Sequence, residues 1–352
     1  MVKWTRAGLV MALAVILTFV VAACGDKKDN AKDHSAQGSS SQTTEGAAAS
    51  DETSKPSGDK VKVNIAINGG LSPLIIAKEK GFYEEAFSKL NAEVVWSKFP
   101  SGPPLLESLV AGRVDLSFLG DGATIAGISN KLPFEIIGLN SEGKSGARLL
   151  VPPNSPIQKL EDVKGKTIGL PKGTVANVYL IKVLDAVGLS ISDVNIINLQ
   201  MDDAQAAFES GKLDGWVAWD PYITQNVNAG KARIVESDTE VLSPTSLIAH
   251  TKFAKEHPEL VVEFLKVYKQ TVDYELAHED ESAQIFSDQT KMSIDTVKQV
   301  LENSTPILSA YTQAALDAQQ ASSDILYENK FIKKQISFKD AVNDTFVTEA
   351  LK

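Results

Sequence analysis

The chain has 352 residues, more than one small hydrophobic core accommodates, so its length predicts at least two lobes. With 43% hydrophobic and 23% charged residues, its composition is that of a globular protein. A net charge of −10 argues against a partner made of nucleic acid, and the single cysteine, Cys24, excludes a disulfide within the chain.

The first residues have the pattern of a bacterial lipoprotein signal. Lys3 and Arg6 give a basic start, and residues 9–22 form an apolar run that is too short to span a bilayer comfortably. The run ends in VAAC, which resembles a lipobox, where the cysteine is lipidated and becomes the first residue. We expect residues 1–23 to be a signal peptide and Cys24 to carry the lipid. The alternative is an ordinary secretory signal that happens to contain a cysteine.

Residues 25–60 contain no Val, Ile, Leu, Met or aromatic residue. Such a segment buries too little apolar surface to order itself. We therefore predict that residues 24–60 comprise the lipidated cysteine and a disordered tether. A lipid anchor followed by a tether suits a protein that works just above a membrane surface.

From Val61 onward, short apolar strands alternate with helices. Strands are expected over residues 61–67, 92–99, 114–120, 133–139, 147–152, 166–170, 194–199 and 214–219. Helices are expected to begin near Ser72-Pro73, Ser101-Gly102-Pro103, Asp121, Gly173-Thr174, Asp202 and Asp220-Pro221, and the last hundred residues to be mostly helical. Strands that alternate with helices predict an α/β fold with mainly parallel sheets covered on both faces.

Two stretches that lie 99 residues apart, AGRVDLSFLGD (111–121) and SGKLDGWVAWD (210–220), share a pattern. In each, an aspartate follows a glycine by three residues, and a second aspartate follows six residues later. We interpret each copy as a helix that ends at the glycine, a turn, and a buried strand whose end faces a ligand, with one copy in each lobe. Coincidence between two ordinary helix–turn–strand units is the alternative.

The helix starts predict a site for a small anion. In open α/β sheets, ligands bind beyond the carboxyl ends of the strands, where helix N-termini offer unpaired N–H groups. Asp121 and Asp220 are interpreted first as helix caps, because a bare carboxylate would repel an anion. Trp219 either packs in the core or lines the cleft, and Trp216 is expected in the core. Binding by amides predicts an affinity that changes little between about pH 5.5 and 8.

No arrangement of residues points to catalysis. His34, His250, His257 and His278 lack the spacing of metal ligands, and the folded part contains no cysteine. The sequence has neither a Gly-x-Ser-x-Gly elbow nor a Walker loop. It therefore favours a binding protein, without cofactor or metal, over an enzyme.

The folded chain resembles the substrate-binding proteins of ABC importers for aliphatic sulfonates, in the superfamily that also holds taurine, nitrate and thiamin-precursor binders. The resemblance is carried, in order, by SPLIIAKEKGFYEE, FPSGPPLLESLVAGRVDLSFLGDG, LLVPPNSPIQKLEDVKGKTIG, DAQAAFESGKLDGWVAWDPY and SSDILYENKFIKKQISF. It implies the two-lobed periplasmic-binding-protein type II architecture, with the chain crossing twice between lobes. Lobe 1 would comprise residues 61–147 and 243–352, and lobe 2 residues 148–242. The family closes its cleft around the ligand by a hinge motion.

The resemblance also implies which residues line the cleft. Carried over by position, they are Gly70, Leu71, Gly102, Gly120, Asp121, Gly173, Thr174, Trp219 and Asp220. In the sulfonate branch, the loop after the Lys-Gly pair is often rich in serine and carries a histidine. Here residues 173–177 read GTVAN, which leaves the exact ligand open. Whether Asn177, or Arg148 near the first crossing, touches the ligand stays open as well.

The implied function is that of a monomeric, extracytoplasmic lipoprotein, anchored at the outer face of the cell membrane. It would bind an aliphatic sulfonate and deliver it to an ABC permease and its ATPase. Taurine, nitrate or a thiamin precursor is the alternative ligand. The alternative from another class of protein is a thiamin-precursor enzyme. Such enzymes use an iron site rich in Cys and His, and the absence of cysteine from the folded part argues against this alternative. The sequence leaves open the preferred sulfonate, the affinity and the permease.

Overall fold

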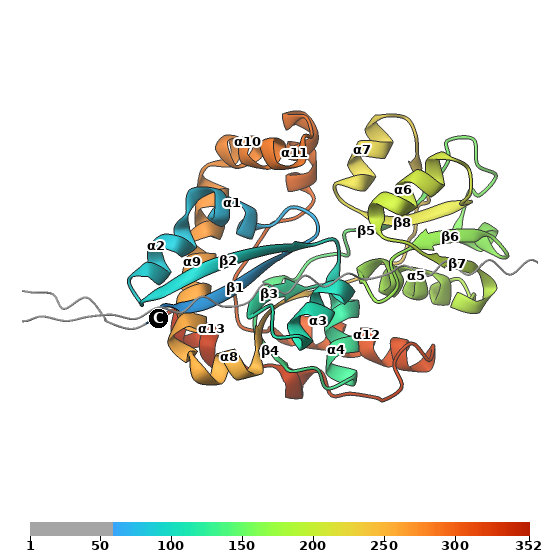
Figure 1. Ribbon diagram of the computed structural model, residues 1–352. Coiled ribbons are helices and arrows are strands. Elements are labelled where there is room, and N and C mark those ends of the chain that lie inside the picture. Colours follow the sequence, from blue (N-terminus) through green and yellow to red (C-terminus); the bar gives the residue numbers. More distant parts are fainter. Residues whose placement is uncertain (1–58) are drawn as a thin grey trace, which may run out of the picture. The chain divides into compact units, whose positions relative to one another are not determined.

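The computed structural model describes residues 59–352. The predicted signal peptide, Cys24 and the predicted tether up to residue 58 lie outside the described residues. Two five-stranded sheets organise the described part, each with helices packed against it (Figure 1). Among these residues, no helix combines the length and the apolar character needed to cross a membrane.

The first sheet has the strand order β2-β1-β3-β10-β4. Its strands are β1 (Val61–Asn68), β2 (Ala92–Phe99), β3 (Leu116–Leu119), β4 (Phe134–Ser141) and β10 (Thr245–His250). β1 pairs in parallel with β2 and β3, whereas β10 runs antiparallel between β3 and β4. The sheet is therefore mixed, and β10 is a strand that the sequence analysis missed.

The helices of this half either cover the two faces of the sheet or pack on the helices that do. They are α1 (Pro73–Lys80), α2 (Phe82–Ser88), α3 (Gly102–Val110), α4 (Asp121–Ser129), α8 (Thr251–Glu256), α9 (Pro258–Ala277), α10 (Glu279–Thr290), α11 (Ile294–Glu302), α12 (Gln313–Glu328) and α13 (Thr345–Ala350), with the 3₁₀ turn η3 (Lys339–Ala341). On one face, Val63 and Ile65 of β1 share a core with α1, α2 and α9. On the other face, Ala66 packs with α3 and α4.

The second sheet has the strand order β7-β6-β8-β5-β9. Its strands are β5 (Ala147–Val151), β6 (Thr167–Leu170), β7 (Asn195–Asn198), β8 (Gly215–Trp219) and β9 (Arg233–Ile234). β6 is parallel to β7 and β8, and β5 is antiparallel to β8 and β9. Helices α5 (Val175–Ala186), α6 (Met201–Glu209) and α7 (Tyr222–Asn228) and the 3₁₀ turns η1 (Leu160–Val163) and η2 (Ile191–Asp193) complete this half.

The two similar sequence stretches have equivalent structures. In each, a glycine at positive φ directly follows the C-cap residue of the preceding helix, α3 or α6. The first aspartate of each copy then accepts a hydrogen bond from a backbone N–H of the neighbouring parallel strand. Asp115 Oδ2 accepts from Asn64 on β1 at 2.8 Å, and Asp214 Oδ2 accepts from Thr167 on β6 at 2.8 Å. The strands that follow, β3 and β8, occupy the same place in their respective sheets.

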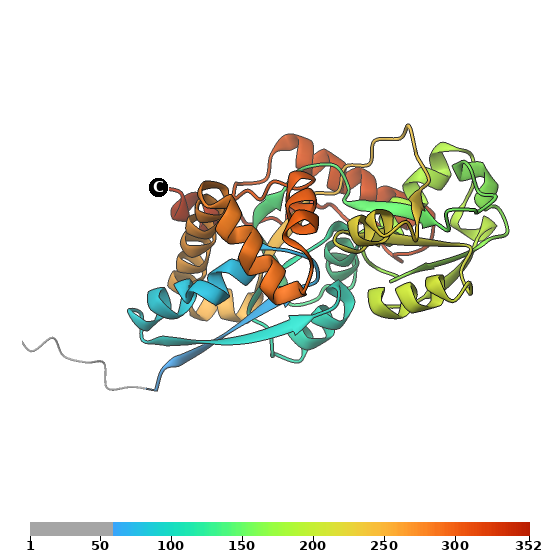
Figure 2. The same cartoon turned by 90° about the horizontal axis from the view of Figure 1, so that it is seen from above.

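We call each sheet with its helices a lobe, lobe 1 for the first sheet and lobe 2 for the second; Figures 1 and 2 show the two groups from the side and from above. The chain crosses between them after β4 and again before β10. The two crossing segments lie side by side, because Lys144 and Leu242 form an antiparallel bridge and the Ser145 N–H donates to the Val241 carbonyl at 2.6 Å. Two adjacent crossing segments are suited to act as a hinge.

Candidate functional site

A cavity of about 260 Å³ lies between the two lobes. Lobe 1 contributes residues that follow β1, β2 and β3, and lobe 2 contributes residues that follow β6 and β8. The cavity is thus at the carboxyl ends of strands from both sheets, where α/β folds bind their ligands. Cavities of this size accommodate small ligands.

Seven of the nine residues that the sequence predicted for the cleft line this cavity: Gly70, Leu71, Gly102, Gly120, Thr174, Trp219 and Asp220. That they bind a ligand stays a prediction. Asp121 and Gly173 are not among the residues that line it.

Asp121 is a structural residue behind the cavity wall. Its side chain is fully buried, and it is the first residue of α4, whose N-cap is Gly120. The interpretation of Asp121 as a helix cap was therefore wrong. Burial raises the pKa of its carboxyl, an effect that Lys182 partly offsets, and burial likewise lowers the pKa of Lys182. For both groups, removal from water outweighs their mutual attraction.

The side chains of Asn177 and Arg148 form hydrogen bonds with nearby backbone groups. Neither these two residues nor Gly173 faces the cavity. Gly173 has a φ of 78°, a conformation that favours glycine, and its N–H donates to Asn177 Oδ1 at 3.2 Å. Arg148 Nη1 donates to the Ala147 carbonyl at 2.7 Å, next to the first crossing segment. None of the three is among the described residues that line the cavity.

Four helices begin at the cavity. α1, α3 and α4 come from lobe 1 and α5 comes from lobe 2, and their N-caps, Ser72, Ser101, Gly120 and Thr174, all line the cavity. The first turn of a helix leaves N–H groups without intrahelical partners and carries the positive end of the macrodipole. α1 and α3 offer fewer of these groups, because Pro73, Pro103 and Pro104 have no N–H. Several such termini around one cavity make it favourable for an anion.

The Ser72 hydroxyl adds a donor that the sequence analysis did not assign to the site. The side chain is 6% exposed, and Oγ has no hydrogen-bond partner among residues 59–352. Ser72 is the N-cap of α1, yet its side chain makes no capping hydrogen bond. A buried hydroxyl without a partner is costly, so an acceptor that came within reach of Oγ would be favoured there. The Ser-Pro pair was visible in the sequence but indicated only a helix start.

Apolar side chains form much of the remaining wall, among them Leu71, Phe118, Val175 and Trp219. Trp219 is half-buried and lines the cavity, whereas Trp216 is fully buried in the core of lobe 2, as the sequence analysis expected. The cavity therefore combines donors for an anion with a surface for a carbon chain.

The two lobes are joined by hydrogen bonds around the cavity. Asp220 Oδ1 accepts from the Thr224 N–H in the first turn of α7 at 3.0 Å, although the N-cap of α7 is Pro221. Asp220 Oδ2 accepts from Asn303 of lobe 1 at 3.3 Å. Ser101, the N-cap of α3, donates to Gln200, the N-cap of α6, at 2.9 Å. Ser101 and Gln200 are 99 residues apart, the offset of the repeat, so equivalent positions of the two lobes meet here. The interpretation of Asp220 as the N-cap was therefore wrong, but its carboxylate bonds to the first turn of α7 and connects the lobes.

The fold is the two-lobed α/β periplasmic-binding-protein type II architecture, in which the chain crosses twice between lobes. Residues 68–282 match the family described as NMT1/THI5 like, and the chain belongs to this family. Among residues 59–352, no three His, Cys, Asp or Glu side chains are grouped as metal ligands would be.

Several similar proteins have names that state a ligand. The chain is 38% identical over 293 residues to a putative aliphatic sulfonates-binding protein of Bacillus subtilis, covering 83% of this chain and 88% of the relative. It is 30% identical over 213 residues to the taurine-binding periplasmic protein of Escherichia coli, covering 58% of this chain and 64% of the relative. The alkanesulfonate-binding protein SsuA from Xanthomonas axonopodis pv. citri, bound to MOPS, shares the fold with a TM-score of 0.75 at 24% identity, over 82% of this chain and 99% of that one.

Proposed function

We propose that this protein is the solute-binding component of an ABC importer and that it binds an aliphatic sulfonate between its lobes. The observation that carries the proposal is the group of four helix N-termini, from both lobes, around one cavity with an unpartnered Ser72 hydroxyl. A sulfonate offers three acceptor oxygens and a single charge, which match uncharged N–H and O–H donors. The names of the relatives support the same ligand class and favour a binding protein over an enzyme.

In this proposal, the apolar part of the cavity wall determines which length of alkyl chain binds most tightly. Each methylene of a ligand that is buried against Leu71, Phe118 and Trp219 adds up to about 0.8 kcal/mol of binding free energy. Affinity should therefore rise from methanesulfonate to ethanesulfonate and butanesulfonate until the cavity is full. Nitrate lacks the apolar part and should bind less tightly than any of them.

Isothermal titration calorimetry with the three alkanesulfonates, taurine and nitrate tests the proposal. Tight binding of at least one sulfonate, with nitrate weaker, is the expected result. Nitrate binding more tightly than every sulfonate would overturn the assignment and favour the nitrate binders of the superfamily.

The cellular setting is the second part of the proposal. The VAAC sequence and the segment that follows it support an extracytoplasmic lipoprotein anchored through Cys24, which passes its ligand as a monomer to a permease and its ATPase. Cys24→Ala should abolish lipid modification. A lipid-modified mass that persists in the variant, measured by mass spectrometry of the intact protein, would contradict the anchoring.

A further inference from the structure

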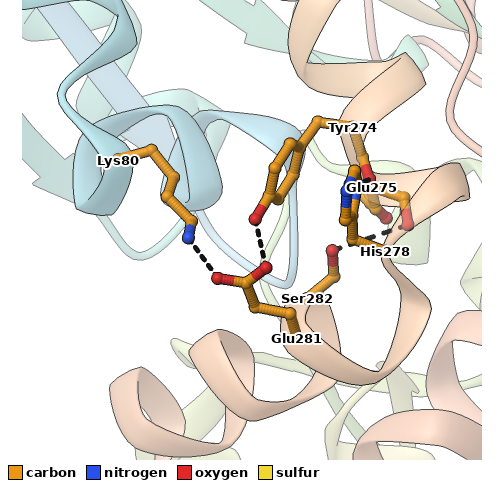
Figure 3. A network of polar contacts seen from close by, with 6 residues as sticks. All are labelled: Lys80, Tyr274, Glu275, His278, Glu281 and Ser282. Carbon is orange, nitrogen blue, oxygen red and sulfur yellow. Dashed lines mark hydrogen bonds and ion pairs between the residues drawn. The ribbon is translucent and has the colours of Figure 1, made fainter.

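Glu275 brings a carboxyl group into the wall of the cavity. It lies in the last turn of α9, its side chain is 6% exposed, and it also lines an adjoining cavity of about 320 Å³ next to α10 and α11. Its Oε2 atom is buried and has no hydrogen-bond partner among residues 59–352. Figure 3 shows Glu275 beside His278; Ser282 contacts its backbone carbonyl, not its carboxyl group.

The nearby cations are paired with other acids. Lys80 of α1 pairs with Glu281, which also accepts from the Tyr274 hydroxyl (Figure 3). Lys298 of α11 pairs with Asp280 of α10 at 2.6 Å. The other titratable groups around Glu275 are Tyr268, His278, Glu279 and Glu302 and, across the cavity between the lobes, Asp220 and Lys144, of which Lys144 pairs with Glu240 at 3.1 Å. Within residues 59–352, Glu275 forms no ion pair.

The carboxyl and two of the helix N-termini approach the cavity from different sides of the first sheet. Glu275 belongs to α9, which packs on the face that carries Val63 and Ile65. α3 and α4, whose N-termini face the cavity, pack on the opposite face with Ala66. α1, whose N-cap is Ser72, packs on the same face as α9, so the separation from Glu275 holds for the N-termini of α3 and α4. These N-termini and a carboxyl that is unpaired among residues 59–352 are together complementary to a molecule that carries both charges.

We propose that Glu275 recognises a positively charged nitrogen of the ligand, so that the protein selects aminoalkanesulfonates over simple alkanesulfonates. This inference rests on the proposed function and narrows its substrate class. A buried carboxylate is stable only when a cation or hydrogen-bond donors meet it, and an ammonium group brings both. A methyl group in the same place leaves the carboxyl unpaired. Burial raises the pKa of Glu275 to about 7, in keeping with a group that lacks such a partner in the protein.

Two ligands of nearly equal size isolate this effect. 2-Aminoethanesulfonate, which is taurine, carries an ammonium group where propane-1-sulfonate carries a methyl group. At pH 8, calorimetry should find that the wild-type protein binds the first at least tenfold more tightly. Glu275→Gln should reduce this ratio of affinities at least tenfold. Glu302→Gln, which removes an exposed carboxyl at the adjoining cavity, should leave the ratio unchanged.

The pH dependence of the wild-type protein gives a second measurement that needs no variant. The ammonium ligand binds the ionised carboxyl, so the ratio of affinities should rise roughly tenfold between pH 6 and pH 8 as a group of pKa about 7 ionises. A ratio that is the same at both pH values, or the same in wild type and Glu275→Gln, overturns the role of Glu275 while leaving sulfonate binding intact. If neither sulfonate binds the wild-type protein, the proposed function fails together with this inference.

Discussion

Gly122 shows how a single residue lets the lobes approach each other. A β-carbon at this position would lie 2.6 Å from the Thr174 carbonyl oxygen, which belongs to the other lobe. Contacts of that length are repulsive, so any larger residue would push α4 away from the start of α5. The absence of a side chain at Gly122 thus permits the arrangement of lobes that encloses the cavity.

Gly122→Ala should therefore weaken ligand binding. Overpacking costs about 1–3 kcal/mol, which corresponds to a loss of sulfonate affinity of roughly 5- to 150-fold if the enclosed state is the one that binds. Gly143→Ala is a matched control, because a β-carbon there meets no atom within 4 Å. Calorimetry on both variants makes the comparison, and equal affinities would show that the close approach is not required for binding.

Glu275 predicts how stability changes with pH in the absence of ligand. Its pKa is about 7 in the folded protein and near 4.5 in a solvated chain, so between these values the folded state binds more protons than the unfolded state. Stability should therefore fall as the pH rises through this window, by up to about 3 kcal/mol. Urea unfolding at pH 5 and pH 8 should show a smaller loss for Glu275→Gln than for wild type. Identical losses would mean that Glu275 titrates normally in the folded protein.

At the residue scale, the sequence predicted the part of the site that follows strands. Gly70, Thr174 and Trp219 were predicted for the cleft by position from the family resemblance, and all three line the cavity. Thr174 and Trp219 also have local signals, because they lie at a helix start and a strand end. Glu275 and Asn303 carry no such signal, because they lie in C-terminal segments that return to the cleft only in the folded chain. Their positions depend on long-range packing, which a single sequence does not encode in its local pattern.

At the element scale, α7 and α11 connect the lobes on one side of the cleft, and Figure 1 shows them side by side at the top. Asn228 Nδ2, in the last turn of α7, donates to Gln299 Oε1 of α11 at 2.7 Å. Together with the bond from Asn303 to Asp220, this contact ties lobe 2 to the C-terminal helices of lobe 1. Opening of the cleft would have to break both bonds.

Gln299→Ala should therefore speed ligand release. A net contribution of about 0.5–1.5 kcal/mol for one hydrogen bond corresponds to a dissociation rate roughly 2 to 12 times higher. Gln284→Ala serves as the control, since Gln284 bonds to Asp288 within α10 and not across the cleft. Stopped-flow tryptophan fluorescence measures the rates. If Gln299→Ala releases the ligand at the same rate as the control, the contact between α7 and α11 does not limit the opening of the cleft.

The elements themselves were largely visible in the sequence. The expected strand over residues 92–99 coincides with β2, and α1 begins at Pro73 as expected. β10 was missed because it follows the second crossing and enters the sheet antiparallel, whereas the alternation of strands and helices indicated parallel order. The local pattern predicts that a segment is extended, but its direction in the sheet depends on where the chain crosses between lobes.

At the scale of the whole molecule, the two lobes are built from similar units that place helix starts at a shared cavity. Asp115 and Asp214 fix equivalent strands, and Ser101 and Gln200 meet between the lobes. Because both lobes contribute N–H groups to one cavity, an anion there would interact with both at once. Ligand binding would thereby favour the arrangement in which the lobes are in contact.

The crystal structure of the protein with the sulfonate that calorimetry finds to bind most tightly tests this account most directly. We predict that the sulfonate lies in the cavity between the lobes. Its oxygens should be about 2.7–3.2 Å from backbone N–H groups at helix starts of both lobes and from the Ser72 hydroxyl. A sulfonate held outside this cavity, or one whose oxygens are bound by lysine or arginine side chains instead of these donors, would contradict it.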